Sequence, residues 1–171
     1  MSPHTEWITR AETPADVPAI RKIVLAAFET PAEADLVDAL RADSSWIPEL
    51  SVVAAGDGDR PIGHALLTRC HIGQTPALCL APVAVLPGHQ RSGAGGAAVR
   101  AALAQAAAMG ERFVVVLGHP EYYPRFGFTR ASAHGIGVSF EVPDEALMAL
   151  SLDPGQAPPA GVIRYAAPFG L

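Results

Sequence analysis

The segment from Leu80 to Met109 constrains the fold of this 171-residue chain more than any other segment. An apolar run of strand length leads through Pro87-Gly88-His89 into a glycine-rich turn, and the helical pattern of Gly93 to Met109 follows directly. Glycine lets a backbone approach a ligand closely. The first N–H groups of a helix lack partners within the helix and, with its dipole, form an anion site. The segment therefore predicts a strand, a phosphate-binding turn and a helix in succession.

The apolar pattern around this segment predicts an α/β (α+β) fold. Apolar residues recur at helical spacing over 20–28 and 32–41, and Thr13 followed by Pro14 is a typical helix start. Strands are expected over 7–11, 50–55, 62–68, 77–86 and 113–117, and near 147–152 and 162–165. An antiparallel meander followed by a strand–helix–strand unit predicts a mixed sheet with helices on both faces. The length fits one domain over residues 1–171.

Composition and charge exclude several classes of protein. The net charge of -5 argues against nucleic acid as the main partner. No apolar run is long enough to span a membrane, and Met1 to Trp7 does not resemble a signal peptide, so we expect a cytoplasmic protein.

Cys70 and Cys79 flank a predicted turn over 73–76, where they could face each other, and we expect two reduced thiols. The histidines and cysteines lack metal-ligand spacing, so no metal is implied.

The glycine-rich turn is compatible with more than one phosphate ligand. Residues 93–98 also satisfy a loose dinucleotide fingerprint, which requires an acidic residue about twenty positions later, at a strand end. Glu111 is the nearest such residue, but it precedes its strand. A nucleoside-triphosphate loop is excluded because no Lys-Ser or Lys-Thr follows the glycines. A turn that only packs a helix against a sheet remains the structural alternative.

The spacing of Gln90, Gly93 and Gly95 resembles the phosphate-binding signature of the GNAT superfamily of N-acetyltransferases, in which Gln or Arg, two residues, Gly, one residue and Gly or Ala follow one another. The resemblance covers roughly residues 6 to 168. Its further parts look like a bacterial branch of acetyltransferases and lie in Leu80 to Pro87, Val116 to Phe128 and Val142 to Ala146. It implies acetyl-CoA as cofactor and a mostly antiparallel sheet with one splayed parallel strand pair.

The resemblance also implies where the cofactor lies. The strand before the turn carries a bulge and diverges from the strand over 113–117, so that the pantetheine arm enters the opening and bonds to exposed backbone. Pro82 gives a local reason, because proline cannot donate a ladder hydrogen bond. The cofactor-binding residues expected on this basis are Val83, Ala84, Val85, Gln90, Arg91, Ser92, Gly93, Ala94, Gly95 and Gly96.

Acyl transfer requires an acid for the departing thiolate and a base for the attacking amine. By resemblance the acid is Tyr123, five residues before Phe128, whereas the adjacent Tyr122 is expected to point elsewhere. The base is not assigned and water is an alternative; the candidates are Glu29, Glu33, Asp35, His64, His119 and Glu121.

The function expected from these observations is N-acetyl transfer from acetyl-CoA to a primary amine, by direct attack in a ternary complex. The acceptor is a small molecule or a peptide, and a homodimer is common in the family. One alternative is an acyl-CoA-binding or sensing domain without turnover. Another is a nicotinamide-dependent oxidoreductase, against which the position of Glu111 counts.

Overall fold

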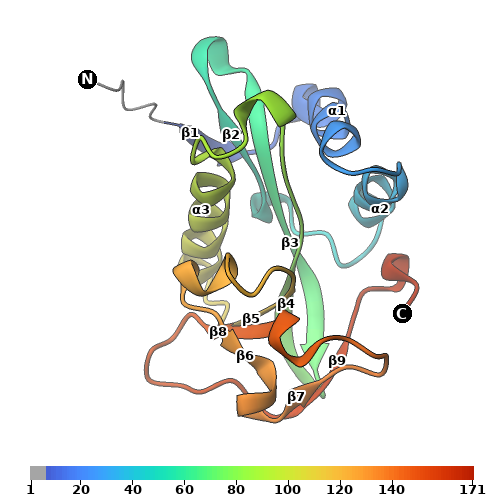
Figure 1. Ribbon diagram of the computed structural model, residues 1–171, viewed down its shortest axis with the longest axis vertical. Coiled ribbons are helices and arrows are strands. Elements are labelled where there is room, and N and C mark those ends of the chain that lie inside the picture. The colour runs from blue at the N-terminus through green and yellow to red at the C-terminus, as the bar shows by residue number, and fades with distance from the viewer. Residues whose placement is uncertain (1–6) are drawn as a thin grey trace.

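A long antiparallel hairpin of β3 (Pro61–Ile72) and β4 (Thr75–Val85) forms the centre of the computed structural model, which describes residues 7–171 (Figure 1). The other strands are β1 (Ile8–Ala11), β2 (Ser51–Ala55), β5 (Phe113–Leu117), β6 (Thr129–Arg130), β7 (Ile136–Gly137), β8 (Leu147–Ser151) and β9 (Gly161–Arg164). Their order is β1-β2-β3-β4-β5-β8-β6, and β9 pairs with β3 and β7. Among the strands of residues 7–171, only the β4–β5 pair and the short β7–β9 contact are parallel. The expected mostly antiparallel mixed sheet is therefore confirmed.

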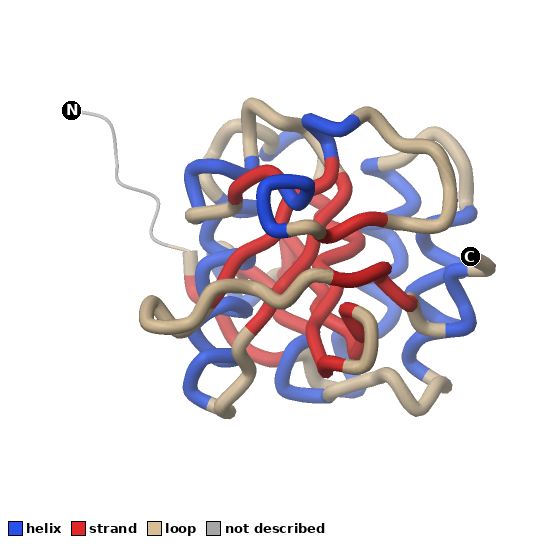
Figure 2. The backbone as a smooth tube through the Cα atoms, turned by 90° about the horizontal axis from the view of Figure 1, so that it is seen from below, coloured by secondary structure: helices blue, strands red, loops and turns tan. Residues whose placement is uncertain are grey.

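In the described part of the chain, three α-helices cover the two faces of the sheet, as expected (Figures 1 and 2). Helices α1 (Val17–Ala27) and α2 (Ala32–Arg41) lie on one face, and α3 (Ala94–Ala108) lies on the other. The residues of α3 that face the sheet are mostly small and fully buried, which lets the helix axis approach the strands closely. In the part of the chain that the structure describes, no helix has the length and apolar character needed to cross a membrane.

Strand pairing extends the predicted hairpin and corrects one expectation about the cysteines. The pairing continues to Ile72 and resumes at Thr75, so the turn itself is only two residues long. Cys79 faces Thr68 and Cys70 faces Ala77, which makes the two cysteines diagonal neighbours and not directly opposed residues. Both are free and buried.

The two-residue strands β6 and β7 were not predicted, because so short a segment shows no periodicity.

The parallel strands β4 and β5 separate after only two residue pairs, Leu78–Val114 and Cys79–Val115. Just beyond, the register of β4 with β3 shifts from Leu67–Leu80 to Ala65–Val83, so β4 carries one extra residue. Both Leu80 and Val83 pack toward α3 although they are three positions apart, which requires a bulge at Ala81 and Pro82. The bulge expected at Pro82 and the splayed strand pair are both present.

Candidate active site

A cleft of about 910 Å³ opens where β4 and β5 separate. Its walls are the C-terminal end of α1, the bulged end of β4, the first turn of α3 and the segment 119–125. The residues that line it are Ala27, Phe28, Val83, Ala84, Val85, His89, Gln90, Arg91, Gly93, Gly95, Gly96, Arg100, His119, Glu121, Tyr122, Tyr123 and Arg125. Val83 of β4 and Tyr123 of the segment after β5 thus line one opening, although 40 positions separate them in the sequence.

The glycine-rich turn leaves three backbone donors free at the start of α3. The first helical hydrogen bond runs from Ala97 N to Gly93 O at 2.9 Å. The N–H groups of Ala94, Gly95 and Gly96 precede it and have no acceptor within the helix. Gly93 caps the helix with φ +88°, a left-handed conformation that favours glycine. These donors and the positive end of the helix dipole form an anion site.

The side chain of Ser92, one of the expected cofactor-binding residues, forms its hydrogen bond within the turn. The N-cap residue is Gly93, and the Ser92 hydroxyl donates to the carbonyl oxygen of His89. The carbonyl oxygen of Ser92 accepts a hydrogen bond from the indole N–H of Trp7 at 3.0 Å. The Trp7 ring also contacts His89 edge-on, with centroids 6.3 Å apart. Ser92 therefore stabilises the turn internally and does not line the cleft.

Gly95 lies where the start of α3 comes close to the end of β4 and to Tyr122. A Cβ built on Gly95 would lie 3.0 Å from Cγ2 of Val85, 3.5 Å from Oη of Tyr122 and 4.0 Å from Cγ1 of Val83. Any side chain at this position would enter the space between the end of β4 and the helix start. The glycine thus keeps the opening wide enough for a chain-like ligand to lie against β4.

Tyr123 lines the cleft, and its ring packs among neighbouring residues. Its ring packs over Gly118, where a side chain would collide with it, and against Phe128 at a centroid distance of 6.0 Å. Burial, with smaller contributions from Tyr122 and Cys79, raises the pKa of Tyr123 to about 12. The phenol is therefore protonated at neutral pH and faces the cleft.

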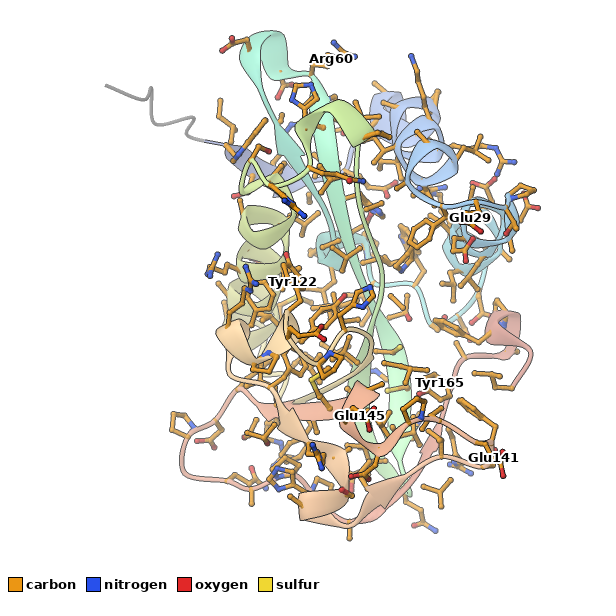
Figure 3. All side chains as sticks on the ribbon, viewed as in Figure 1. Glu29, Arg60, Tyr122, Glu141, Glu145 and Tyr165 are labelled. Carbon is orange, nitrogen blue, oxygen red and sulfur yellow. The ribbon has the colours of Figure 1, made fainter. Side chains whose placement is uncertain are left out.

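Tyr122 also lines the cleft, which corrects the expectation that it points elsewhere. Figure 3 shows Tyr122 on the α3 side of β4, and Glu29 on the opposite side where α1 and α2 meet. Burial raises the pKa of Tyr122, while Arg125 and Arg100 oppose the rise. Its hydroxyl lies near Gly95, at the start of α3.

The candidate bases separate into two groups. His119 and Glu121 line the cleft, beside the tyrosines. The others do not: Asp35 pairs with Arg21 at 2.9 Å, Glu33 accepts from Thr30, Glu29 is exposed, and His64 is buried against Ser51. The structure thus brings two of the six candidates to the cleft.

Most of the expected cofactor residues meet at the cleft, and several lining residues were not predicted. Val83, Ala84, Val85, Gln90, Arg91, Gly93, Gly95 and Gly96 line it, whereas Ser92 and the buried Ala94 do not. Arg100, Arg125, Ala27 and Phe28 were missed. Of these four residues, only Arg100 could have been predicted from the sequence. It follows Gly96 by one helical turn and therefore lies on the same helix face. Glu111, considered for a dinucleotide site, instead pairs with Arg69 at 2.6 Å.

No group of three or more metal-ligating side chains gathers within residues 7–171.

Comparison with known proteins identifies close likenesses for the whole arrangement. Residues 17–128 match the model of the acetyltransferase (GNAT) family. The chain is 38% identical over 136 residues to the uncharacterised N-acetyltransferase YjhQ of Escherichia coli K12. This alignment covers 77% of this chain and 75% of that protein. The crystal structure of Escherichia coli YhbS with CoA superposes with a TM-score of 0.89 at 27% identity, over 100% of this chain and 96% of that one. The crystal structure of a GNAT acetyltransferase of Brucella melitensis with acetyl-CoA gives a TM-score of 0.78 at 32% identity, over 97% of this chain and 99% of that one.

Proposed function

Because this chain belongs to the acetyltransferase (GNAT) family, whose cofactor is acetyl-CoA, we propose that it transfers an acetyl group to a primary amine by direct attack in a ternary complex. The observation that carries the proposal is the cleft itself. Free N–H donors of α3 and a protonated tyrosine lie on the walls of one opening between two diverging strands. The acceptor is a small molecule or a peptide that carries the amine.

The residues at the helix start fit the anionic end of the cofactor. The N–H groups of Gly95 and Gly96 and the guanidinium of Arg91 supply donors for a diphosphate. Arg91 lines the cleft from the turn that precedes α3, where it adopts φ +63°. The backbone of Val83 to Val85, past the bulge, has no β5 partner and can bond to the amide groups of an extended arm. When bound, the cofactor supplies an acetyl thioester.

Two proton transfers complete the reaction. The amine forms a bond to the acetyl carbon, the carbon–sulfur bond breaks, and the amine loses one proton. Tyr123 holds its proton at neutral pH and would give it to the departing sulfur. His119 or Glu121, which both line the cleft, or a water molecule held by them, would accept the proton of the amine.

Binding of acetyl-CoA is the first test. Calorimetric titration should give saturable binding by the unmodified protein and none by Gly93→Trp, because a large side chain at this left-handed cap would block the anion site. Gly88→Trp is the control, since nothing lies within 4 Å of a Cβ built at Gly88. Thermal melts of both variants establish that they are folded.

Turnover is the second test, and it separates an enzyme from a domain that only binds acyl-CoA. A panel of small-molecule and peptide amines is screened for release of free thiol from acetyl-CoA. Amine-dependent thiol release supports transfer. Saturable binding without release by any amine would favour the non-catalytic alternative, and the absence of binding at millimolar acetyl-CoA would overturn the proposal.

A further inference from the structure

Besides Arg91, the cleft is lined by Arg100 and Arg125, and none of these three arginines has a carboxylate partner among residues 7–171. Among residues 7–171 no carboxylate lies within ion-pair distance of Arg100 or Arg125, and both side chains are exposed. By contrast, the arginines that pair with carboxylates are Arg10, Arg21, Arg41, Arg69 and Arg130. Two positive charges that the protein leaves uncompensated at one cleft favour an anionic ligand.

Aromatic rings hold both guanidinium groups in place. Cζ of Arg125 lies 4.3 Å from the ring centroid of Tyr122, and its Nε donates to the Tyr122 carbonyl oxygen at 2.8 Å. Cζ of Arg100 lies 5.0 Å from the ring centroid of Phe126. The Tyr122 and Phe126 rings contact each other edge to face, with centroids 5.3 Å apart. The two guanidinium groups therefore rest on one cluster of aromatic rings.

Arg100 owes its position to Gly96. Helical side chains tilt toward the N-terminus, so Arg100 reaches back by one turn over the face of Gly96. A Cβ built at Gly96 would lie 3.0 Å from Nη1 of Arg100 and would displace the guanidinium. Because Gly96 has no side chain, it leaves room for the guanidinium of Arg100 as well as for a ligand.

The donors converge on the first turn of α3. A Cβ built at Gly95 would lie 3.5 Å from the Tyr122 hydroxyl, Nη1 of Arg100 lies beside the neighbouring Gly96, and the Arg125 guanidinium stacks on the Tyr122 ring. Arg91 and the free N–H groups already provide donors for a diphosphate. The additional donors match a phosphate monoester, which has three terminal oxygens and a charge near −2 at neutral pH.

We propose that Arg100, Arg125 and Tyr122 form a second phosphate subsite, which takes the 3′-phosphate monoester on the adenosine of coenzyme A. The inference rests on the proposed function and deepens it. Through this subsite the protein distinguishes coenzyme A from its 3′-dephosphorylated form, which carries the same diphosphate and the same pantetheine arm.

The test compares coenzyme A and 3′-dephospho-coenzyme A by calorimetry. The unmodified protein should bind the dephosphorylated form at least about tenfold more weakly. The double variant Arg100→Gln, Arg125→Gln should bind both forms with nearly equal affinity. Arg112→Gln is the matched control, because Arg112 also packs on an aromatic ring, that of Phe113 at 5.7 Å, but lies outside the cleft. Like the unmodified protein, the control variant should bind 3′-dephospho-coenzyme A more weakly than coenzyme A.

Three outcomes would overturn the inference. Equal affinity of the unmodified protein for the two forms would contradict the 3′-phosphate subsite but not the proposed function. Equal weakening of both forms in the double variant would assign the arginines to the diphosphate. Absence of binding of either form would overturn the inference and the proposed function together. Thermal melts of the variants establish that each is folded.

Discussion

The hydroxyl oxygen of Ser51 lies 2.8 Å from Nε2 of His64, a completely buried residue of β3, the strand between β2 and β4. Ser51 donates its only hydroxyl proton to the Glu12 carboxylate, so it accepts from Nε2–H of the histidine. Nδ1 of His64 is then unprotonated, and it has no partner within residues 7–171. Burial and the nearby Arg41 lower the pKa of His64 to about 3.

This arrangement predicts a loss of stability in acid. Between about pH 6.5 and pH 3 the unfolded chain binds a proton at His64 that the folded chain does not, so the free energy of unfolding falls as pH falls. The slope from this group is at most about 1.4 kcal/mol per pH unit. Urea unfolding from pH 7 to pH 4 should show a shallower dependence for His64→Gln than for the unmodified protein. His71→Gln, on the same strand, is the control, and equal slopes for all three proteins would contradict the prediction.

Replacement of Tyr123 by Phe should lower kcat by about a hundredfold or more and leave the affinity for acetyl-CoA within about twofold. The reason is that the phenol proton acts only when the thiolate departs. Since the pKa of Tyr123 is about 12, the kcat of the unmodified protein should not fall through this group below about pH 10. Steady-state kinetics and calorimetry provide the measurements. Tyr122→Phe is the comparison, and an equal loss of kcat in that variant would argue against the assignment.

Gly95→Val should raise the KM for acetyl-CoA about tenfold or more, because the side chain would press against Val85 in the cleft wall. The same substitution at Gly88, where the space is open, should change KM little. Thermal melts are needed to separate narrowing of the cleft from loss of folding. A Gly95→Val protein that is folded and has an unchanged KM would show that the cofactor does not pass this point.

Both cysteines should resist thiol reagents in the folded protein. Burial raises the pKa of Cys70 to about 12 and raises that of Cys79 well above its usual value, so little of the reactive thiolate is present. A chromogenic disulfide reagent at pH 8 should react slowly with the native protein and should titrate two thiols after unfolding in urea. Rapid modification of the native protein would contradict the buried positions.

The sequence by itself determined the local parts of the site. Turn residues and helical spacing placed the strand, the glycine turn and α3 in order, and the helix start with its free N–H groups follows from that order alone. Pro82 indicated the bulge for a similarly local reason, since it cannot donate to a ladder. Periodicity also gave the two helices on the other face.

Only the tertiary structure decided which side chains meet in the cleft. Tyr122 faces Gly95, and Arg125 joins Arg100, because the segment after β5 folds back over the start of α3. The diagonal placement of Cys70 and Cys79 and the burial of His64 depend on the register of β3 with its neighbours. Register and docking arise from contacts between residues far apart in the chain, and a local pattern of propensity and spacing carries no information about such contacts.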